Sequence, residues 1–149
     1  MTTPSFIFRP ATQIDFEFAY QLMKTTMQQH IVATWGEWDE AFQREYNQEK
    51  FDPAVNSIIV VDQQDIGVLL MKEDVETIKI ERFFITPKYQ NKGIGTSIML
   101  ELIQKAKDER KKLSLTVIKA NTRAKQFYEK LGLQVTSEDK ERYTLSTQA

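Results

Sequence analysis

A short loop between an apolar segment and an amphipathic one carries the residues best suited to bind an anion. Residues 80–85 read as a strand, and Gly93 and Gly95 lead directly into a helical pattern. The first backbone N–H groups of a helix lack acceptors and carry a partial positive charge, so a phosphate can bind there. Glycine lets the backbone turn tightly and approach a ligand closely. The spacing therefore predicts a pyrophosphate site, with Gln90 as a donor and Lys92 as a cation at its rim.

The elements that must position this loop follow from hydrophobic periodicity. Residues 62–65 read as a hairpin turn, and a break around residues 32–36 separates the first two helices. A strand–helix–strand connection through residues 94–106 implies a parallel strand pair, whereas hairpins imply antiparallel neighbours. The chain thus predicts a mixed sheet with helices on both faces. The expected strands lie at 6–9, 57–61, 66–71, 77–86, 114–118, 133–136 and 142–145, and the expected helices begin near 12–15, 38, 94 and 121.

Two sequence signatures resemble those of a known family. The spacing Gln90-x-x-Gly93-x-Gly95 resembles the acyl-CoA loop of the GNAT superfamily, the GCN5-related N-acetyltransferases. Residues 117–133 are similar to its second signature, Asn-x-x-Ala-x-x-x-Tyr-x-x-x-Gly-Phe, with Leu133 in place of the usual Phe. The signatures stand in the right order about 25 residues apart. The order of elements extends the resemblance to nearly all 149 residues and implies one GNAT domain over 1–149.

The resemblance implies an α/β (α+β) fold with a mixed, mostly antiparallel twisted sheet. Its central parallel strands, 77–86 and 114–118 here, would splay apart to admit acetyl-CoA as co-substrate. Phe83, Phe84 and Ile85 would contact the cofactor through their backbones, with the Ile85 N–H near the thioester carbonyl. These three can equally be core strand residues. The remaining implied cofactor-binding residues are Gln90, Asn91, Lys92, Gly93, Ile94, Gly95, Thr96 and Asn121.

Tyr128 is the first candidate catalytic residue, because the resemblance places a tyrosine acid at this position. Attack by an amine on a thioester expels a thiolate, which a phenol with an ordinary pKa of about 10 can protonate. Tyr128 also lies on the apolar stripe of its helix, so core packing is the alternative. Asn121 has two interpretations as well: it is a favoured N-cap residue, and the resemblance implies that it bonds the cofactor.

Glu81 is the candidate general base, since an ammonium group must lose a proton before it can attack. Period-two alternation predicts that Glu81 shares a face with Phe83 and Ile85. Relatives with a catalytic glutamate on this strand place it two residues earlier, where this chain has Lys79. A salt bridge from Glu81 to a neighbouring base is the alternative, and many relatives use ordered waters instead.

An acceptor site is expected at the junction of the first two helices. His30, Trp35, Glu37 and Trp38 cluster there in the sequence, and aromatic walls with carboxylates suit an amine. Acidic residues outnumber basic ones over 37–52, and the reverse holds over 88–112. This distribution suits an anionic cofactor and a cationic acceptor, although solvated helix faces and simple packing explain most of these residues.

Composition narrows the classes of protein. Hydrophobic residues make up 41% of the chain and charged residues 28%, as in a globular domain. With no cysteine and only His30, neither a metal site nor a cysteine nucleophile is expected. A net charge of −1 gives no general attraction to nucleic acid or membranes. The N-terminus lacks the pattern of an export signal, so a cytoplasmic location is expected. Exposed edge strands leave a homodimer possible.

These observations predict an N-acetyltransferase that moves acetyl from acetyl-CoA to a primary amine of a small molecule or peptide. Because the chain has no cysteine, transfer would be direct, within a ternary complex. The alternative is a non-catalytic acyl-CoA-binding regulatory module that keeps the loop without turnover. A nucleotide-binding protein is disfavoured, because the loop lacks both the Gly-Lys-[Ser/Thr] ending of a P-loop and the Gly-x-Gly-x-x-Gly of a dinucleotide fold.

Overall fold

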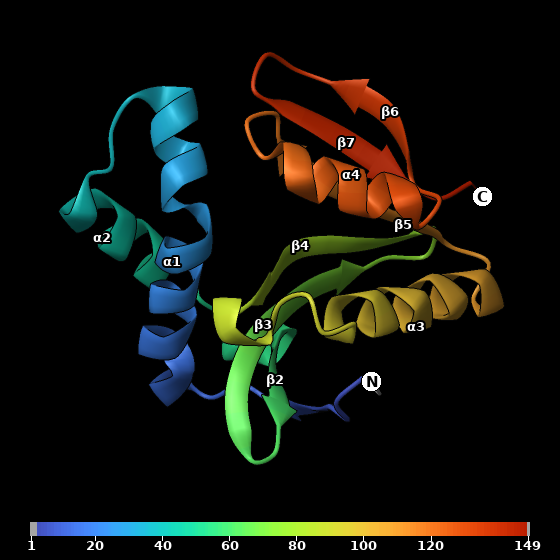
Figure 1. Ribbon diagram of the computed structural model, residues 1–149, viewed down its shortest axis with the longest axis horizontal. Coiled ribbons are helices and arrows are strands. Elements are labelled where there is room, and N and C mark those ends of the chain that lie inside the picture. The colour runs from blue at the N-terminus through green and yellow to red at the C-terminus, as the bar shows by residue number, and fades with distance from the viewer. Residues whose placement is uncertain (1–2, 149) are drawn as a thin grey trace.

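The computed structural model describes residues 3–148, whose strands form one seven-stranded sheet in the order β1-β2-β3-β4-β5-β7-β6 (Figure 1). Every neighbouring pair is antiparallel except β4 and β5, which are parallel. The mixed, mostly antiparallel sheet that the sequence predicts is therefore confirmed. The strands are β1 (Ile7–Pro10), β2 (Asn56–Val61), β3 (Gln64–Glu73), β4 (Thr77–Ile85), β5 (Lys112–Ile118), β6 (Gln134–Glu138) and β7 (Arg142–Ser146).

Helices cover both faces of the sheet. In Figure 1, α1 and α2 lie together on one side of the molecule, away from α3 and α4. The apolar side chains of α3 and α4 share one core cluster with the sheet, whereas those of α1 form separate clusters on the opposite face. The helices are α1 (Phe16–Trp35), α2 (Glu40–Lys50), α3 (Ile94–Asp108) and α4 (Thr122–Lys130), with 3-10 turns at Gln13–Asp15, Pro53–Val55 and Pro87–Tyr89.

The apolar run of β2 shows why its strand is buried on both sides. Ile59 and Val61 belong to the cluster with α3, and Ile58 and Val60 belong to the cluster with α1. Successive side chains of a strand point to opposite faces, so a strand between two helical layers must be apolar at every position. Residues 58–61 meet that requirement, which fixes β2 inside the sheet.

Three element boundaries differ from those expected. The first helix continues through the expected break and ends at Trp35, because Gly36 takes the left-handed conformation that terminates a helix (φ 93°). The second helix begins at Glu40, where the carboxylate of Asp39 accepts the Phe42 N–H at 3.0 Å. The hairpin turn is tighter than predicted, since Asp62 and Gln63 alone form it, both with positive φ.

An ion pair links β1 to the 3-10 turn that precedes α1. The buried Asp15 carboxylate accepts bonds from the Arg9 guanidinium at 2.8 and 3.0 Å and from the Thr12 N–H at 2.8 Å. The Arg9 bond is the main cause that lowers the pKa of Asp15, and the Thr12 N–H contributes. A lowered carboxylate pKa gives stability that is present above the unfolded-state pKa and is lost as pH falls through the folded-state value.

We therefore expect Asp15→Asn to lower the free energy of unfolding at pH 7 by about 1–3 kcal/mol. The difference from the native protein should shrink as pH falls from the unfolded-state pKa of about 3.9 through the lowered folded-state pKa, below which the carboxyl is protonated in both states. Urea denaturation at pH 7 and at pH 3 measures this, with the exposed turn variant Asp62→Asn as the control. An equal loss at both pH values would contradict the ion-pair explanation.

Candidate active site

The parallel pair β4–β5 separates halfway along its length. The two strands pair only from Thr77–Lys112 to Ile80–Leu115. Beyond Ile80, β4 continues along β3 to Ile85, and β5 continues along β7 to Ile118. The facing backbone edges of residues 81–85 and 116–118 are thus not paired with each other. This opening is the splay that the resemblance to the GNAT superfamily implies, and it can accept the amides of an extended ligand.

The register of β4 decides which backbone groups face the opening. The Thr86 N–H bonds the Ile66 carbonyl at 2.8 Å, next to the Ile85–Gly67 pair. In an antiparallel ladder this makes Ile85–Gly67 a non-hydrogen-bonded pair, and bonded and non-bonded pairs alternate. The N–H groups of Ile85 and Phe83 therefore point away from β3 into the opening, whereas that of Phe84 points toward β3. Of the three expected backbone contacts, the geometry supports Phe83 and Ile85.

The loop after β4 has the shape of an anion site. Gly93 takes the left-handed conformation (φ 86°) and directly precedes α3, and its carbonyl accepts the Ser97 N–H at 3.0 Å. The Ile94 side chain is fully buried, while Lys92 and Thr96 are exposed beside the helix start. Ile94 thus anchors the first turn in the core, and the free N–H groups of that turn remain beside the exposed Lys92 cation.

Two side chains of this loop hold it against neighbouring elements through hydrogen bonds. Gln90 is the donor expected at the phosphate rim, but its Nε2 donates to the Ile85 carbonyl at 2.8 Å and holds the loop against β4. Asn91 has positive φ, and its Oδ1 accepts a bond from Arg123 of α4 at 2.6 Å. Sequence reasoning missed Arg123, because no spacing rule connects positions 91 and 123. Arg123 adds a second cation beside Lys92 and ties the loop to α4.

Gly95 differs from Gly93 because it lies inside α3 with helical geometry. A Cβ at position 95 would meet Ile85 Cδ1 and Phe127 Cζ at 3.6 Å, an ordinary van der Waals distance. We expect Gly95→Ala to raise the free energy of unfolding by up to about 1 kcal/mol, since alanine favours helix. Acetyl-CoA affinity should stay within about threefold. Denaturation and calorimetric titration measure the two effects, and a large loss of affinity would mean that a ligand uses this space.

Tyr128 lies where α4 meets the sheet. Its side chain is 8% exposed, belongs to the main core cluster, and packs edge-on against Phe127 with centroids 5.1 Å apart. Burial raises its pKa, so the phenol keeps its proton at neutral pH. Among the described residues its hydroxyl has no hydrogen-bond partner. Asn121 caps the same helix, with Oδ1 accepting the Ala124 N–H at 3.1 Å.

Glu81 does not share a face with Phe83 and Ile85, and that expectation is wrong. Leu70 pairs with Arg82 and Met71 pairs with Ile80, so Glu81 is the extra residue of a β-bulge. The bulge shifts the alternation, and Glu81 reaches Lys72 at 3.6 Å as the ion pair that was the alternative. Phe83 and Ile85 pack toward α3, whereas Glu81 lines a cavity near α1 and α2.

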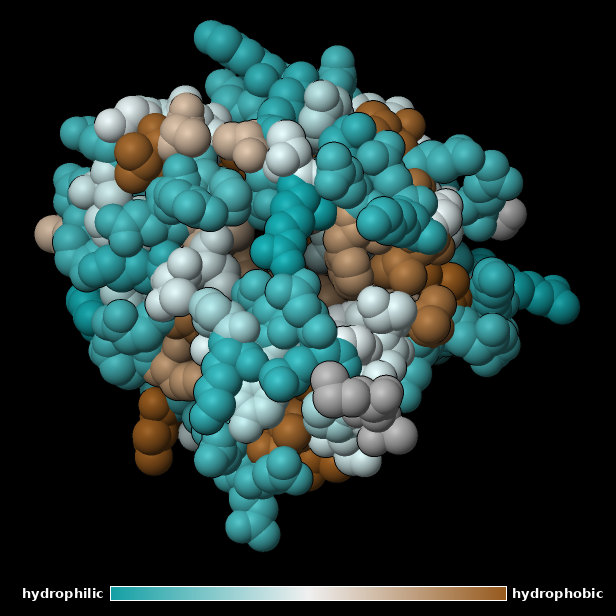
Figure 2. Space-filling view, in the orientation of Figure 1, coloured by the Kyte–Doolittle hydropathy of each residue, from teal (hydrophilic) through white to brown (hydrophobic). Residues whose placement is uncertain are grey.

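That cavity lies between α1, α2 and the sheet and has a volume of about 370 Å³. Aromatic and aliphatic side chains form much of its wall, and Glu81 and Arg82 enter it from β4, beside the splay. Figure 2 shows apolar side chains at the floor of a hollow near the centre of this face. A pocket of this kind next to the open strand edges can admit a second substrate.

The four residues expected at the acceptor site do not line this cavity, although Trp38 packs against the cluster that contains its wall residues Phe16 and Tyr20. Trp35 is at the end of α1, where the Arg142 guanidinium lies 5.0 Å from its ring. His30 lies on the preceding turn, and burial lowers its pKa. Trp38 donates to Glu40 at 2.6 Å, and Glu37 is exposed. None of the four lines this cavity.

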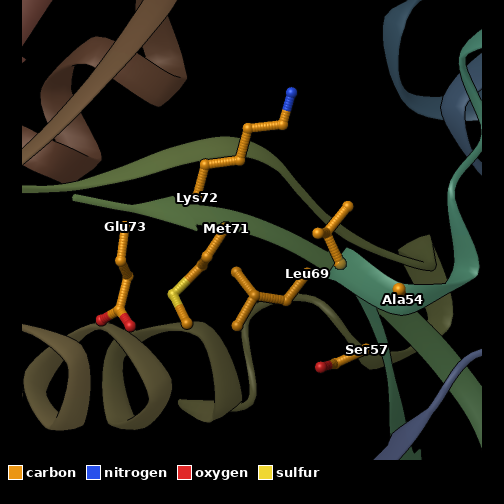
Figure 3. A pocket seen from close by; sticks show the side chains of 7 residues that line it. Ala54, Ser57, Leu69, Met71, Lys72 and Glu73 are labelled. Atoms are coloured by element: carbon orange, nitrogen blue, oxygen red, sulfur yellow. The ribbon is translucent and has the colours of Figure 1, made fainter.

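A larger cavity of about 570 Å³ lies at the other face of β3 (Figure 3). Leu69, Met71 and Glu73 project toward α3 there, while Lys72 projects to the opposite side of the strand. No residue of the expected cofactor or acceptor sets lines it, and it is distant in sequence from the anion loop. The larger volume of this cavity therefore does not make it the acceptor site. The smaller cavity, which lies beside the splay, is the candidate acceptor site.

Metal-ligating clusters and membrane-spanning helices are both missing from residues 3–148. No group of three or more metal-ligating side chains occurs in that range, and none of its helices has the length and hydropathy that crossing a membrane requires.

Comparison with known proteins agrees with this geometry. The sequence profile of the Acetyltransferase (GNAT) family matches residues 18–133. No curated protein sequence matches significantly. The structure is similar to the PaiA N-acetyltransferase of Thermoplasma acidophilum in complex with coenzyme A, with a TM-score of 0.76 and 19% identity, covering 97% of this chain and 99% of that one.

Two other solved structures are also similar over nearly the whole chain. An acetyltransferase from Thermus thermophilus has a TM-score of 0.73 and 17% identity, covering 98% of each chain. Arabidopsis thaliana Naa50, in complex with the bisubstrate analogue CoA-Ac-MVNAL, has a TM-score of 0.66 and 13% identity, covering 97% of this chain and 99% of that one. At these identities the likeness establishes the fold. The profile match spans well over half of the sequence, and the chain belongs to the GNAT acetyltransferase family.

Proposed function

We propose that this protein transfers the acetyl group of acetyl-CoA to a primary amine in a direct ternary complex. The observation that carries the proposal is the splay of β4 from β5 beside the Gly93 turn that opens α3. The turn offers N–H groups and cations to the pyrophosphate, and the splay offers backbone groups to the pantetheine amides. Structural relatives bound to coenzyme A and to a CoA–peptide analogue support acetyl-CoA and a small-molecule or peptide amine.

In the proposed reaction each group in the opening has one role. The amine nitrogen attacks the thioester carbonyl carbon, and the Ile85 N–H stabilises the oxyanion, an effect of about 3 kcal/mol in a preorganised site. Collapse of the tetrahedral intermediate breaks the carbon–sulfur bond. The departing thiolate takes a proton from Tyr128, which its buried environment keeps protonated. The proton that the nitrogen loses as it becomes an amide returns to the Tyr128 oxygen and restores the phenol. Glu81, or a water held by it, accepts the proton that the ammonium group releases.

Calorimetric titration with acetyl-CoA, and with ATP as a control, tests the proposal. Binding of acetyl-CoA in the micromolar range without binding of ATP is the expected result. Thiol release from acetyl-CoA in the presence of an amine panel then measures transfer, and the protein has no thiol of its own to interfere. Failure to bind acetyl-CoA would refute the proposal. Binding without transfer to any amine would favour the alternative, a regulatory acyl-CoA-binding module.

A homodimer and a cytoplasmic location stay predictions. β1 and β6 are the free edges of the sheet, and every residue of β6 is exposed. Light scattering of the purified protein tests the dimer.

A further inference from the structure

Arg82 is a cation in the candidate acceptor cavity that forms no direct ion pair with a carboxylate of the described residues. Its guanidinium makes no hydrogen bond to a side chain and no ion pair within residues 3–148. Its neighbour Glu81 pairs with Lys72 instead. The half-buried position of Arg82 on β4 lowers its pKa by desolvation, the unfavourable setting that a bound anion would relieve.

Four other arginines of the chain have partners, and Arg110, which has none within residues 3–148, is exposed, so Arg82 differs from all of them in being partly buried without a partner. Arg9 binds Asp15 and Asp65, Arg44 binds Glu17, Arg123 binds Asn91, and Arg142 stacks on Trp35. These pairs stabilise the fold. A planar guanidinium offers several N–H donors in a geometry that matches a carboxylate, so a partly buried arginine without such a partner indicates a place for one.

A second polar group in the same cavity also lacks a partner. Asn47 of α2 is buried, and its Oδ1 has no hydrogen bond within the described residues. Its Nδ2 is occupied, since it donates to the Gln43 carbonyl at 2.6 Å. A buried carbonyl oxygen without a donor costs free energy. The wall of the cavity therefore holds a guanidinium that can bind an anion and, behind its surface, a carbonyl oxygen to which no described residue donates.

The cavity also contains carboxylates that can pair with a cationic amine. Glu49, Asp52 and Glu81 line it together with Arg82, Lys50 and Lys72, so the two signs of charge are balanced. Many of the acidic residues that predict a purely cationic acceptor have structural partners: Glu40 binds Lys24, Tyr20 and Trp38, and Asp39 caps α2. A volume of about 370 Å³ lies at the lower end for ligand pockets.

From these contacts we infer that the acceptor is a free amino acid, whose carboxylate Arg82 binds while its amine faces the splay. The inference rests on the proposed function and names the substrate class of that site. Arg82 directly precedes Phe83, whose backbone faces the opening, so a carboxylate held by Arg82 places an amine a few atoms away beside the thioester. Arg82 is thus a specificity-determining residue, and recognition depends on a zwitterion instead of a simple polyamine.

The test uses as acceptors the eighteen proteinogenic amino acids that have a primary amine and no thiol, the matching amino-acid amides, and spermidine, with thiol release from acetyl-CoA as the readout. The amides keep the amine and the side chain but lack the carboxylate. We expect the best amino acid to exceed its amide in kcat/KM by about tenfold or more. Arg82→Gln should remove most of that ratio through KM, and Arg82→Lys should restore only part of it, because lysine lacks the planar fork.

Two controls separate this inference from the proposed function. Acetyl-CoA titration of each variant shows whether the cofactor site is intact, and Arg110→Gln, an exposed arginine in the turn after α3, should keep the native ratio. If acetyl-CoA does not bind, the proposed function itself fails. If acetyl-CoA binds, then equal turnover of acid and amide, preference for spermidine, or no turnover of any amino acid overturns the inference alone.

Discussion

Tyr128→Phe should lower kcat about tenfold or more while leaving acetyl-CoA affinity nearly unchanged. The substitution removes only the hydroxyl, and the ring keeps its packing against Phe127 and the core cluster. Without the phenolic proton the thiolate must leave unprotonated or wait for water. Because the hydroxyl has no partner among residues 3–148, its removal should not reduce the free energy of unfolding. Single-turnover kinetics with acetyl-CoA measure the step directly.

Tyr143→Phe is a matched control for this experiment. Tyr143 packs against the same core cluster from β7, and its ring lies near Lys119 and Lys125. Loss of its hydroxyl should change neither kcat nor the acetyl-CoA dissociation constant. If Tyr128→Phe turned over at the native rate, Tyr128 would be a core residue only, and a water would have to protonate the thiolate.

Gly93→Val should have the opposite effect: it should weaken acetyl-CoA binding so strongly that kcat can no longer be measured at saturation. Position 93 has φ 86°, a conformation that a β-branched residue strongly disfavours. A Cβ there would also come within 2.6 Å of Thr3 Oγ1, and it would fill space beside the first N–H groups of α3. The affinity should fall by about a hundredfold or more, because the phosphates lose several N–H bonds. Calorimetric titration measures the loss.

Gly36→Val separates strain from ligand exclusion. Gly36 has nearly the same φ, 93°, and a Cβ there would meet nothing within 4 Å. It ends α1, far from the anion loop in sequence, so its valine variant should have a similar backbone strain and still bind acetyl-CoA. Equal losses of affinity in both variants would mean that global destabilisation, and not the loop, causes the effect.

Local pattern was enough to predict the fold and the loop. The apolar run at 58–61 requires burial on both faces, and the helical stripe from Ile94 onward requires a helix that starts at the glycines. The Asn121 cap and the Gly132 turn follow from the preferences of single residues. Each of these features depends on residues within a few positions of one another, so the local sequence is enough to predict it.

The composition of the site depended on contacts between distant positions. The bulge that turns Glu81 and Arg82 toward α1 and α2 arises from the register of β4 against β3, and strict alternation along β4 predicts the opposite face for Glu81. The bond between Asn91 and Arg123, and the lack of an ion pair between Arg82 and any carboxylate of residues 3–148, likewise depend on how whole elements pack. Sequence periodicity specifies which residues of one helix or strand lie on the same face of it. Only the tertiary structure decides which charges of different elements meet, because that is set by strand register and by helix placement across the sheet.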